Sequence, residues 1–185
     1  MFSKVGALAV VTAVTGLAVT AVGSTLSTSN RATVPEAAAT SINGQADSTE
    51  KIGMTTYSWG RLVSDWTIHR DGSGEFQSSR QVGGFNDYVI VTKRLDAVAG
   101  RYQQLEALVR PAAPYEATGL QCGPRITDLP YGNLHWRREG LAHDLSFDYG
   151  CSSSEARQLL HQVAAADALV RDWAANAPVV DERKP

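Results

Sequence analysis

The side chains with the most distinctive chemistry in this 185-residue chain are its two cysteines, Cys122 and Cys151. In an oxidising compartment, two cysteines in a chain of this size are typical of a structural disulfide. We therefore expect Cys122 to be bonded to Cys151. Closing a loop of about 30 residues should stabilise the folded chain by about 3.5 kcal/mol through the loss of entropy in the unfolded chain.

The alternative use of these cysteines is a thiol hydrolase with Cys151 as its nucleophile. Cys151 directly precedes a predicted helix, and the N-terminus of a helix stabilises a thiolate. His143 or His135, on the predicted strands before it, could act as the base. This chemistry requires that Cys122 is not bonded to Cys151.

Metal and serine chemistry have no recognisable motif in the chain. The four histidines show no His-x-x-x-His spacing, and the cysteines form no Cys-x-x-Cys pair. A nucleophile elbow of the Gly-x-Ser-x-Gly type is missing as well. On a strand, His143 would point away from Asp144 and Ser146, so these three residues cannot form a triad by themselves. We expect no metal and no cofactor.

The four tryptophans divide into two groups. Trp66, Trp136 and Trp173 fall on apolar stripes, so we predict that they pack in the core. Trp59 lies near Tyr57 at the start of the first predicted strand, and we expect its side chain to be exposed. Trp59 is therefore a candidate for a recognition edge.

The first part of the folded region reads as strands. Residues 59–69 are rich in β-forming residues, and Asp71-Gly72-Ser73-Gly74 has the composition of a turn. Residues 75–80 would return as a second strand, and residues 88–92 would form a third. Ile68 and Phe76 share the buried face only if even-numbered residues face even-numbered residues, and we prefer this register.

A helix is predicted next, over residues 95–108, from apolar residues spaced three and four apart. It must end by Arg110, because Pro111 and Pro114 cannot continue a helix. Gly100 would lie in its interior at a cost of about 1 kcal/mol relative to alanine, so the helix would depend on packing.

Residues 133–138 and 141–149 are predicted to form a hairpin about Glu139-Gly140. A two-residue loop would pair Trp136 with His143 and Leu134 with Leu145. The core face would then carry Leu134, Trp136, Leu145, Phe147 and Tyr149. The opposite face would carry His135, Arg137, Asp144, Ser146 and Asp148.

The last predicted helix runs from a capping box of Ser152 and Glu155 to about residue 175. The predicted class is therefore α+β: an antiparallel sheet of about five strands, in the order strand, strand, strand, helix, strand, strand, helix. The two helices would pack on one face of the sheet. We place this single domain at residues 55–176 and a frayed tail at residues 177–185. The other face is a candidate binding surface through His135, Arg137, Asp144 and Asp148.

The N-terminal residues 1–23 have the layout of a secretory signal peptide. Lys4 precedes an uncharged apolar run that closes on Ala21-Val22-Gly23, which predicts cleavage after Gly23. The run is near the lower length limit for a membrane-spanning helix, so an uncleaved anchor is the alternative. Residues 24–54 are rich in Ser, Thr and Ala and are predicted to be a disordered tether.

A net charge of −2 and the lack of a basic run argue against nucleic acid or an anionic membrane as the main partner. We expect a periplasmic or secreted protein that acts as a non-catalytic binding or inhibitor-like module of the cell envelope. Its partner would be an envelope or extracellular protein or peptide. The alternatives are the thiol hydrolase using Cys151 and His143, and a structural envelope protein held by an uncleaved signal.

Overall fold

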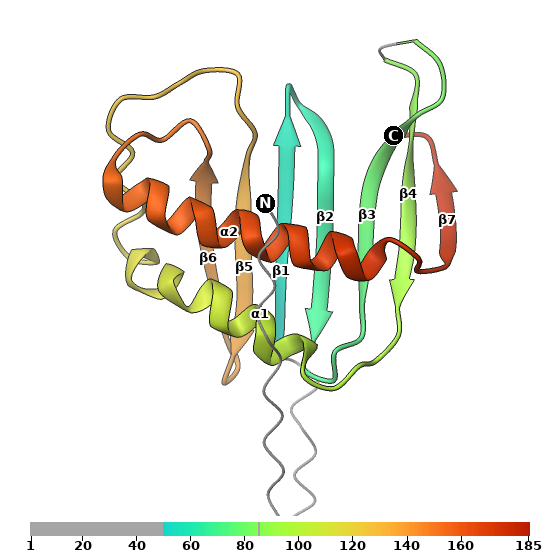
Figure 1. Ribbon diagram of the computed structural model, residues 1–185, viewed down its shortest axis with the longest axis horizontal. Coiled ribbons are helices and arrows are strands. Elements are labelled where there is room, and N and C mark those ends of the chain that lie inside the picture. The colour runs from blue at the N-terminus through green and yellow to red at the C-terminus, as the bar shows by residue number, and fades with distance from the viewer. Residues whose placement is uncertain (1–49, 85) are drawn as a thin grey trace, which may run out of the picture. The chain divides into compact units, whose positions relative to one another are not determined.

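The computed structural model describes residues 50–84 and 86–185. Within them the chain forms seven strands and two α-helices (Figure 1). The elements are β1 (Lys51–Ser58), β2 (Arg61–His69), β3 (Gly74–Gln81), β4 (Tyr88–Leu95), α1 (Arg101–Val109), the 3₁₀ helix η1 (Arg110–Tyr115), β5 (Tyr131–Arg138), β6 (Leu141–Asp148), α2 (Ser154–Ala174) and β7 (Val179–Arg183). The predicted signal peptide, and the tether up to residue 49, lie outside the described residues.

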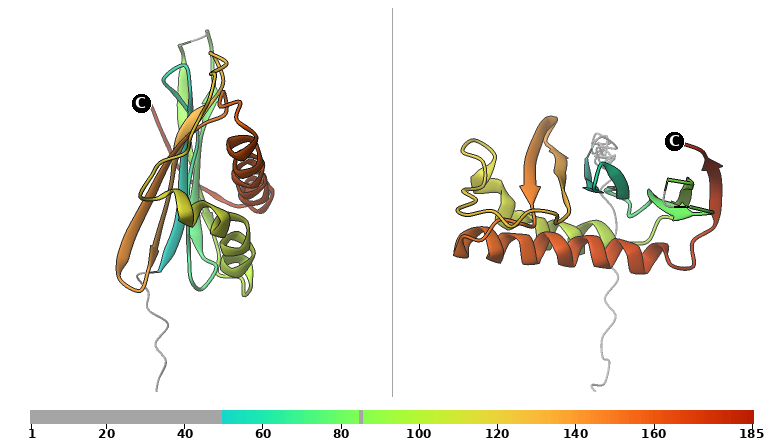
Figure 2. Two further views of the ribbon diagram at one scale, coloured as in Figure 1. Left: turned by 90° about the vertical axis from the view of Figure 1, so that its left-hand side faces the viewer. Right: turned by 90° about the horizontal axis from the view of Figure 1, so that it is seen from above.

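All seven strands belong to one antiparallel sheet with the order β6-β5-β1-β2-β3-β4-β7. Both helices lie on the same face of this sheet (Figure 2). The predicted α+β class and the two helices are confirmed, whereas the sheet has seven strands and not about five. We call the face without helices the free face.

The first additional strand is β1, which begins at Lys51 within the segment that we predicted to be a tether. Its Ile52 and Met54 are fully buried, so these residues belong to the core. The prediction began the first strand at residue 59 and missed β1, because the chain reverses at Trp59-Gly60 and tryptophan is not a typical turn residue.

The second additional strand is β7, where we predicted a frayed tail. All five of its residues are exposed, so no apolar alternation marks it in the sequence. It is held by antiparallel pairing with β4 and by an ion pair between Arg80 and Glu182 at 2.7 Å. Its charged residues Asp181, Glu182 and Arg183 suit an outermost strand, since charge discourages pairing with other chains.

The boundary between β4 and α1 also differs from the prediction. Leu95 is the last residue of β4 and not the first of a helix, although it is buried as its apolar type requires. Gly100 is the N-cap of α1, with a φ of 90° that favours glycine. Because Gly100 lies outside the helix, it does not destabilise α1 in the way expected of a glycine in a helix interior. The α-helix ends at Val109 before Pro111, which confirms the predicted stop.

The β5–β6 hairpin is formed as predicted. Trp136 pairs with His143 and Leu134 pairs with Leu145. In the β2–β3 hairpin, Trp66 pairs with Phe76, so even-numbered residues face even-numbered residues as expected.

The long helix α2 begins one residue later than its predicted cap implied. Ser153 is the N-cap, and its Oγ accepts a hydrogen bond from the Ala156 backbone N–H at 3.0 Å. Ser152 Oγ instead donates to the Pro124 carbonyl at 2.6 Å. Glu155 does not close a capping box, because its carboxylate accepts from the Tyr115 hydroxyl at 2.8 Å.

The core lies between the helices and one face of the sheet. Fully buried side chains from the sheet include Ile52, Trp66 and Leu134, and those from the helices include Leu105 and Val163. Each fully buried aliphatic side chain contributes about 1.5–3 kcal/mol. The predicted disulfide is confirmed: Cys122, in the loop after η1, is bonded to Cys151.

Candidate functional site

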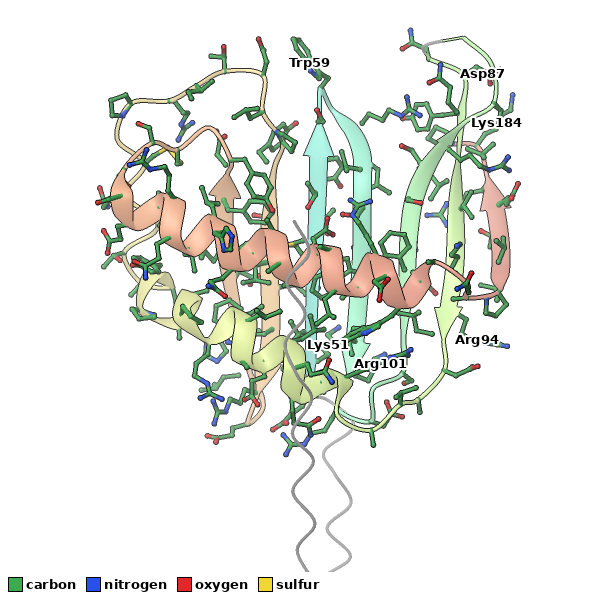
Figure 3. The ribbon with its side chains drawn as sticks, viewed as in Figure 1. Lys51, Trp59, Asp87, Arg94, Arg101 and Lys184 are labelled. Carbon is green, nitrogen blue, oxygen red and sulfur yellow. A yellow bond between two sulfur atoms is a disulfide. The ribbon has the colours of Figure 1, made fainter. Side chains whose placement is uncertain are left out.

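The β1–β2 turn places a large apolar side chain in water. Trp59 and Gly60 have φ values of 53° and 73°, as a two-residue hairpin turn requires. The Trp59 side chain is 74% exposed, which confirms the expected exposure. Figure 3 shows it at the tip of the β1–β2 hairpin. Trp59 therefore occupies a strained backbone conformation and gains little from burial in return.

Beside this turn the sheet is divided. β2 and β3 pair only where Asp65–Ile68 face Gly74–Gln77, and beyond these residues the two strands separate (Figure 1). A cavity of about 620 Å³ lies between the β1–β2 and β3–β4 hairpins. We call it the groove. It is lined by Ser58, Trp59, Gly60, Arg61, Leu62, Val63, Ser78, Ser79, Asn86, Tyr88 and Arg171.

Arg61 is held in a fixed orientation within the groove. Its Cζ lies 4.3 Å from the centroid of the Tyr88 ring, a cation–π contact. Its Nε donates to Ser79 Oγ at 3.0 Å, and Ser79 Oγ donates to the Leu62 carbonyl at 2.7 Å. Among residues 50–84 and 86–185, no carboxylate lies within ion-pair distance of Arg61. Its two terminal nitrogens can therefore bind an external anion.

A second guanidinium reaches the groove from α2. Arg171 Nε donates to Asp167 Oδ2 at 2.6 Å. The other carboxylate oxygen of Asp167 accepts from Ser64 Oγ at 2.9 Å and from Trp66 Nε1 at 3.0 Å. Ser64 and Trp66 are fully buried on β2, so this carboxylate joins the helix to the sheet. Burial, with a further contribution from the negative charge of Asp167, raises the pKa of the nearby Tyr149 to about 12.

A smaller pocket shares Trp59 with the groove. Its volume is about 260 Å³, and it lies against the loop between η1 and β5. Three further exposed apolar residues line it, namely Ile126, Leu129 and Tyr131, at 63%, 41% and 44% exposure. Exposed apolar side chains gathered in one place are typical of interaction surfaces. The apolar surface around Trp59 thus continues from the groove to this loop.

The free face carries the sequence-predicted residues of the β5–β6 hairpin. His135 pairs with Asp144 on β6 and with Gly53 on β1. A Cβ at Gly53 would lie 2.1 Å from His135 Nε2, so the imidazole lies directly over this glycine. Desolvation lowers the pKa of His135, although Asp65 and Asp144 partly oppose this effect. His135 is therefore half-buried in the sheet surface.

The other predicted binding residues are not gathered around His135. Arg137 lies toward the hairpin turn, and Asp148 lies at the opposite end of β6. Asp148 Oδ2 is 3.6 Å from Arg125 Nε and lines both the small pocket and a cavity of about 420 Å³ beside the disulfide. Of the predicted binding residues, only Trp59 and Asp148 line any of these three cavities, and both predicted cysteines line the cavity beside the disulfide.

The pair of residues predicted for thiol chemistry is separated. The Cys151 sulfur is bonded to Cys122, so it carries no thiolate. His143 lies near the start of β6, whereas Cys151 follows the end of that strand. His143 Nδ1 contacts Glu116 Oε2 at 2.5 Å, and its ring stacks on Trp136 with centroids 5.5 Å apart. A hydrolase using these two residues would require both reduction and a rearrangement of β6.

Sequence reasoning did not find the groove arginines. Arg61 and Arg171 are far apart in the chain, and no motif connects them. The available signal was the Trp59-Gly60 dipeptide, because a glycine after an exposed aromatic residue is compatible with a hairpin turn. Recognising that turn would have revealed β1 before it. It would also have placed Arg61 at the start of the returning strand β2, next to the exposed Trp59.

Comparisons with protein-family models, with curated proteins and with solved structures found no significant match for this chain. In the part of the chain that the structure describes, no helix has the length and apolar character needed to span a membrane. No group of three or more potential metal ligands was found among those same residues.

Proposed function

We propose that this protein is an exported, non-catalytic binding module of the cell envelope whose ligand occupies the groove beside Trp59. The observation that carries this proposal is the conformation of Trp59, with a φ of 53° and 74% exposure. A left-handed conformation costs an ordinary residue about 1–2 kcal/mol, and asparagine or glycine would form the same turn more easily. A bulky apolar residue kept there at this cost is expected to contact a ligand.

The surroundings of Trp59 support this role. A cavity of about 620 Å³ is within the range of roughly 300–1,000 Å³ that holds small ligands or segments of larger ones. The groove combines aromatic, cationic and hydrogen-bonding side chains, which is the mixture that gives both affinity and orientation. Export is supported by the signal-like residues 1–23 and by the Cys122–Cys151 disulfide.

Equilibrium binding to envelope fractions tests the proposal. The purified full chain, with its disulfide intact, would be titrated with fractions from the cells that produce it. We expect saturable binding that Trp59→Ala weakens about tenfold or more, as for a central tryptophan in an interface.

The matched control is Leu141→Ala, because Leu141 is 65% exposed at the turn-proximal start of β6, on a different hairpin. This variant removes a comparable exposed apolar side chain and should bind like the wild type. The absence of saturable binding to every fraction would contradict the proposal. If Trp59→Ala and Leu141→Ala weakened envelope binding equally, the binding would be caused by general surface hydrophobicity and not by the groove.

A further inference from the structure

We infer that the groove recognises an acidic sugar, a saccharide that carries a carboxylate such as a hexuronic acid. This inference rests on the proposed binding function and names the chemical class of the ligand. Three features of the groove support it: the two arginines, the hydroxyl and amide groups that also line it, and the exposed indole of Trp59.

Arg61 is arranged to bind a carboxylate. Its Nε is engaged by Ser79 and its cationic face by Tyr88, so the guanidinium is held while its terminal nitrogens stay available. Two parallel N–H donors on one guanidinium match the two oxygens of a carboxylate, and such bidentate contacts are among the strong hydrogen bonds of proteins. Fixing the guanidinium in advance reduces the entropy lost on binding.

The charge of the groove suits one carboxylate. Arg61 and Arg171 both line it, and none of the acidic residues that the structure describes does so. Asp167, which does not line the groove, forms an ion pair with Arg171 and offsets the positive charge of that arginine. One net positive charge therefore remains for a ligand, which fits a single anionic group better than a highly charged polyanion.

The remaining lining residues suit a polyhydroxylated ligand. Ser58, Ser78 and Asn86 provide donors and acceptors that sugar hydroxyls can bind. The indole of Trp59 offers a broad apolar surface to the C–H face of a pyranose ring, while its N–H can still bond to a hydroxyl or to water. The groove therefore offers a guanidinium for the carboxylate of an acidic sugar, polar side chains for its hydroxyls and an indole for its ring.

An added peptide strand fits the groove less well. Strand addition requires a free edge with unpaired backbone groups. Where β2 and β3 separate, the Leu62 carbonyl already accepts a hydrogen bond from Ser79 Oγ at 2.7 Å. The hydroxyl of Ser79 therefore joins the two strands across the gap, and an entering strand would have to break this contact.

Calorimetric titration of the full chain tests the inference. The probes are D-glucuronate and tetragalacturonate, compared with the methyl-esterified tetragalacturonate and with a tetraglutamate peptide. We expect saturable binding of the uronates that weakens with salt, and at least tenfold weaker binding of the ester. The peptide should not compete.

Variants locate the site. Arg61→Gln should weaken uronate binding at least tenfold, and Arg61→Lys should give an intermediate loss because it keeps the charge but not the bidentate geometry. Arg157→Gln is the matched control: Arg157 is exposed on α2, about 21 Å along the helix from Arg171, and its loss should have no effect. Unchanged melting temperatures would show that each variant is folded.

The acidic-sugar inference would be overturned if neither uronate binds, if the ester binds as tightly as the acid, or if only the peptide binds. Envelope binding that depends on Trp59, together with no uronate binding, would overturn this inference alone and leave the proposed function intact. If the protein bound neither the envelope fractions nor the uronates, the proposed function would be overturned as well.

Discussion

Two hairpin turns of this protein have the same backbone conformation but different residues. Trp59-Gly60 has φ values of 53° and 73°, and Glu139-Gly140 has values of 52° and 80°. Asn-Gly is the preferred sequence for such a turn, because asparagine tolerates the left-handed conformation better than tryptophan or glutamate. At the scale of single residues, both positions therefore carry a local strain that a substitution can relieve.

We predict that Trp59→Asn and Glu139→Asn each raise the free energy of unfolding by about 0.5–1 kcal/mol. Urea denaturation of each purified variant measures this change, with the denaturant slope expected to stay constant. If Trp59→Asn instead lowered the stability, the indole would be contributing to folding. The explanation of Trp59 as a residue retained for binding would then fail.

The residues of the candidate site were only partly predictable. An aromatic residue outside any apolar stripe is expected to be exposed, and Trp59 is. Arg61 was not predictable, because its orientation depends on Tyr88, which only the folded chain brings to it. Arg171 pairs with Asp167 one turn earlier on its own helix, but its place beside the groove depends on the contacts of Asp167 with Ser64 and Trp66 on β2. Residue types carry no information about which distant partners fix them in place.

At the scale of elements, one carboxylate of α2 adds polar contacts with the sheet to the packing of the buried apolar residues of that helix. Asp167 accepts hydrogen bonds from Ser64 and Trp66 on β2 and from Arg171 on its own helix. A buried donor that loses its acceptor costs about 1–3 kcal/mol, so this carboxylate is expected to contribute strongly to helix docking.

We predict that Asp167→Ala lowers the free energy of unfolding by about 3 kcal/mol, because Ser64 and Trp66 lose their acceptor. Asp167→Asn should cost about 1 kcal/mol, since its amide oxygen can still accept from β2 while the ion pair with Arg171 is lost. Chemical denaturation of the two variants separates these contributions. Equal, small effects would indicate that water replaces the carboxylate and that α2 is held by apolar packing alone.

Elements with a strong apolar period were predictable, and those without it were not. The β5–β6 hairpin follows from the alternation of Leu134 and Trp136 with polar residues, and its register was confirmed. The fully exposed β7 has no such pattern and depends on pairing with β4. For α1, the apolar spacing that began at Leu95 continued across the end of a strand, so the pattern alone misplaced the helix start.

At the scale of the whole molecule, the disulfide joins the long loop after η1 to the segment that leads into α2. The Cys122 carbonyl also accepts hydrogen bonds from the backbone N–H groups of Ser152 and Ser153, at 3.0 and 3.1 Å. The bond therefore fixes a loop that has little regular structure of its own. Neither cysteine lines the groove, and β1 lies between β5 and the strand β2 that carries Arg61.

We predict that replacing both Cys122 and Cys151 with serine lowers the free energy of unfolding by about 3 kcal/mol. Envelope binding by the folded double variant should be unchanged, because neither sulfur lines the groove. Urea denaturation and the binding titration measure the two effects. Loss of activity toward an envelope substrate without loss of folding would instead favour the thiol hydrolase.

The fold class was predictable, but the strand order was not. Alternating strands and two amphipathic helices specify an α+β sandwich, and both features are local. The position of β1 between β5 and β2 depends on pairing between segments that are far apart in the chain, such as Lys51 with Arg137. The groove arises from this same level of organisation, since it exists only where β2 and β3 stop pairing.

The most direct test of the account compares Trp59→Asn with Glu139→Asn in one experiment that measures both stability and envelope binding. We predict that both variants are more stable than the wild type, that Trp59→Asn binds at least tenfold more weakly, and that Glu139→Asn binds normally. Wild-type binding by a stabilised Trp59→Asn variant would contradict the central claim that this tryptophan is retained for recognition.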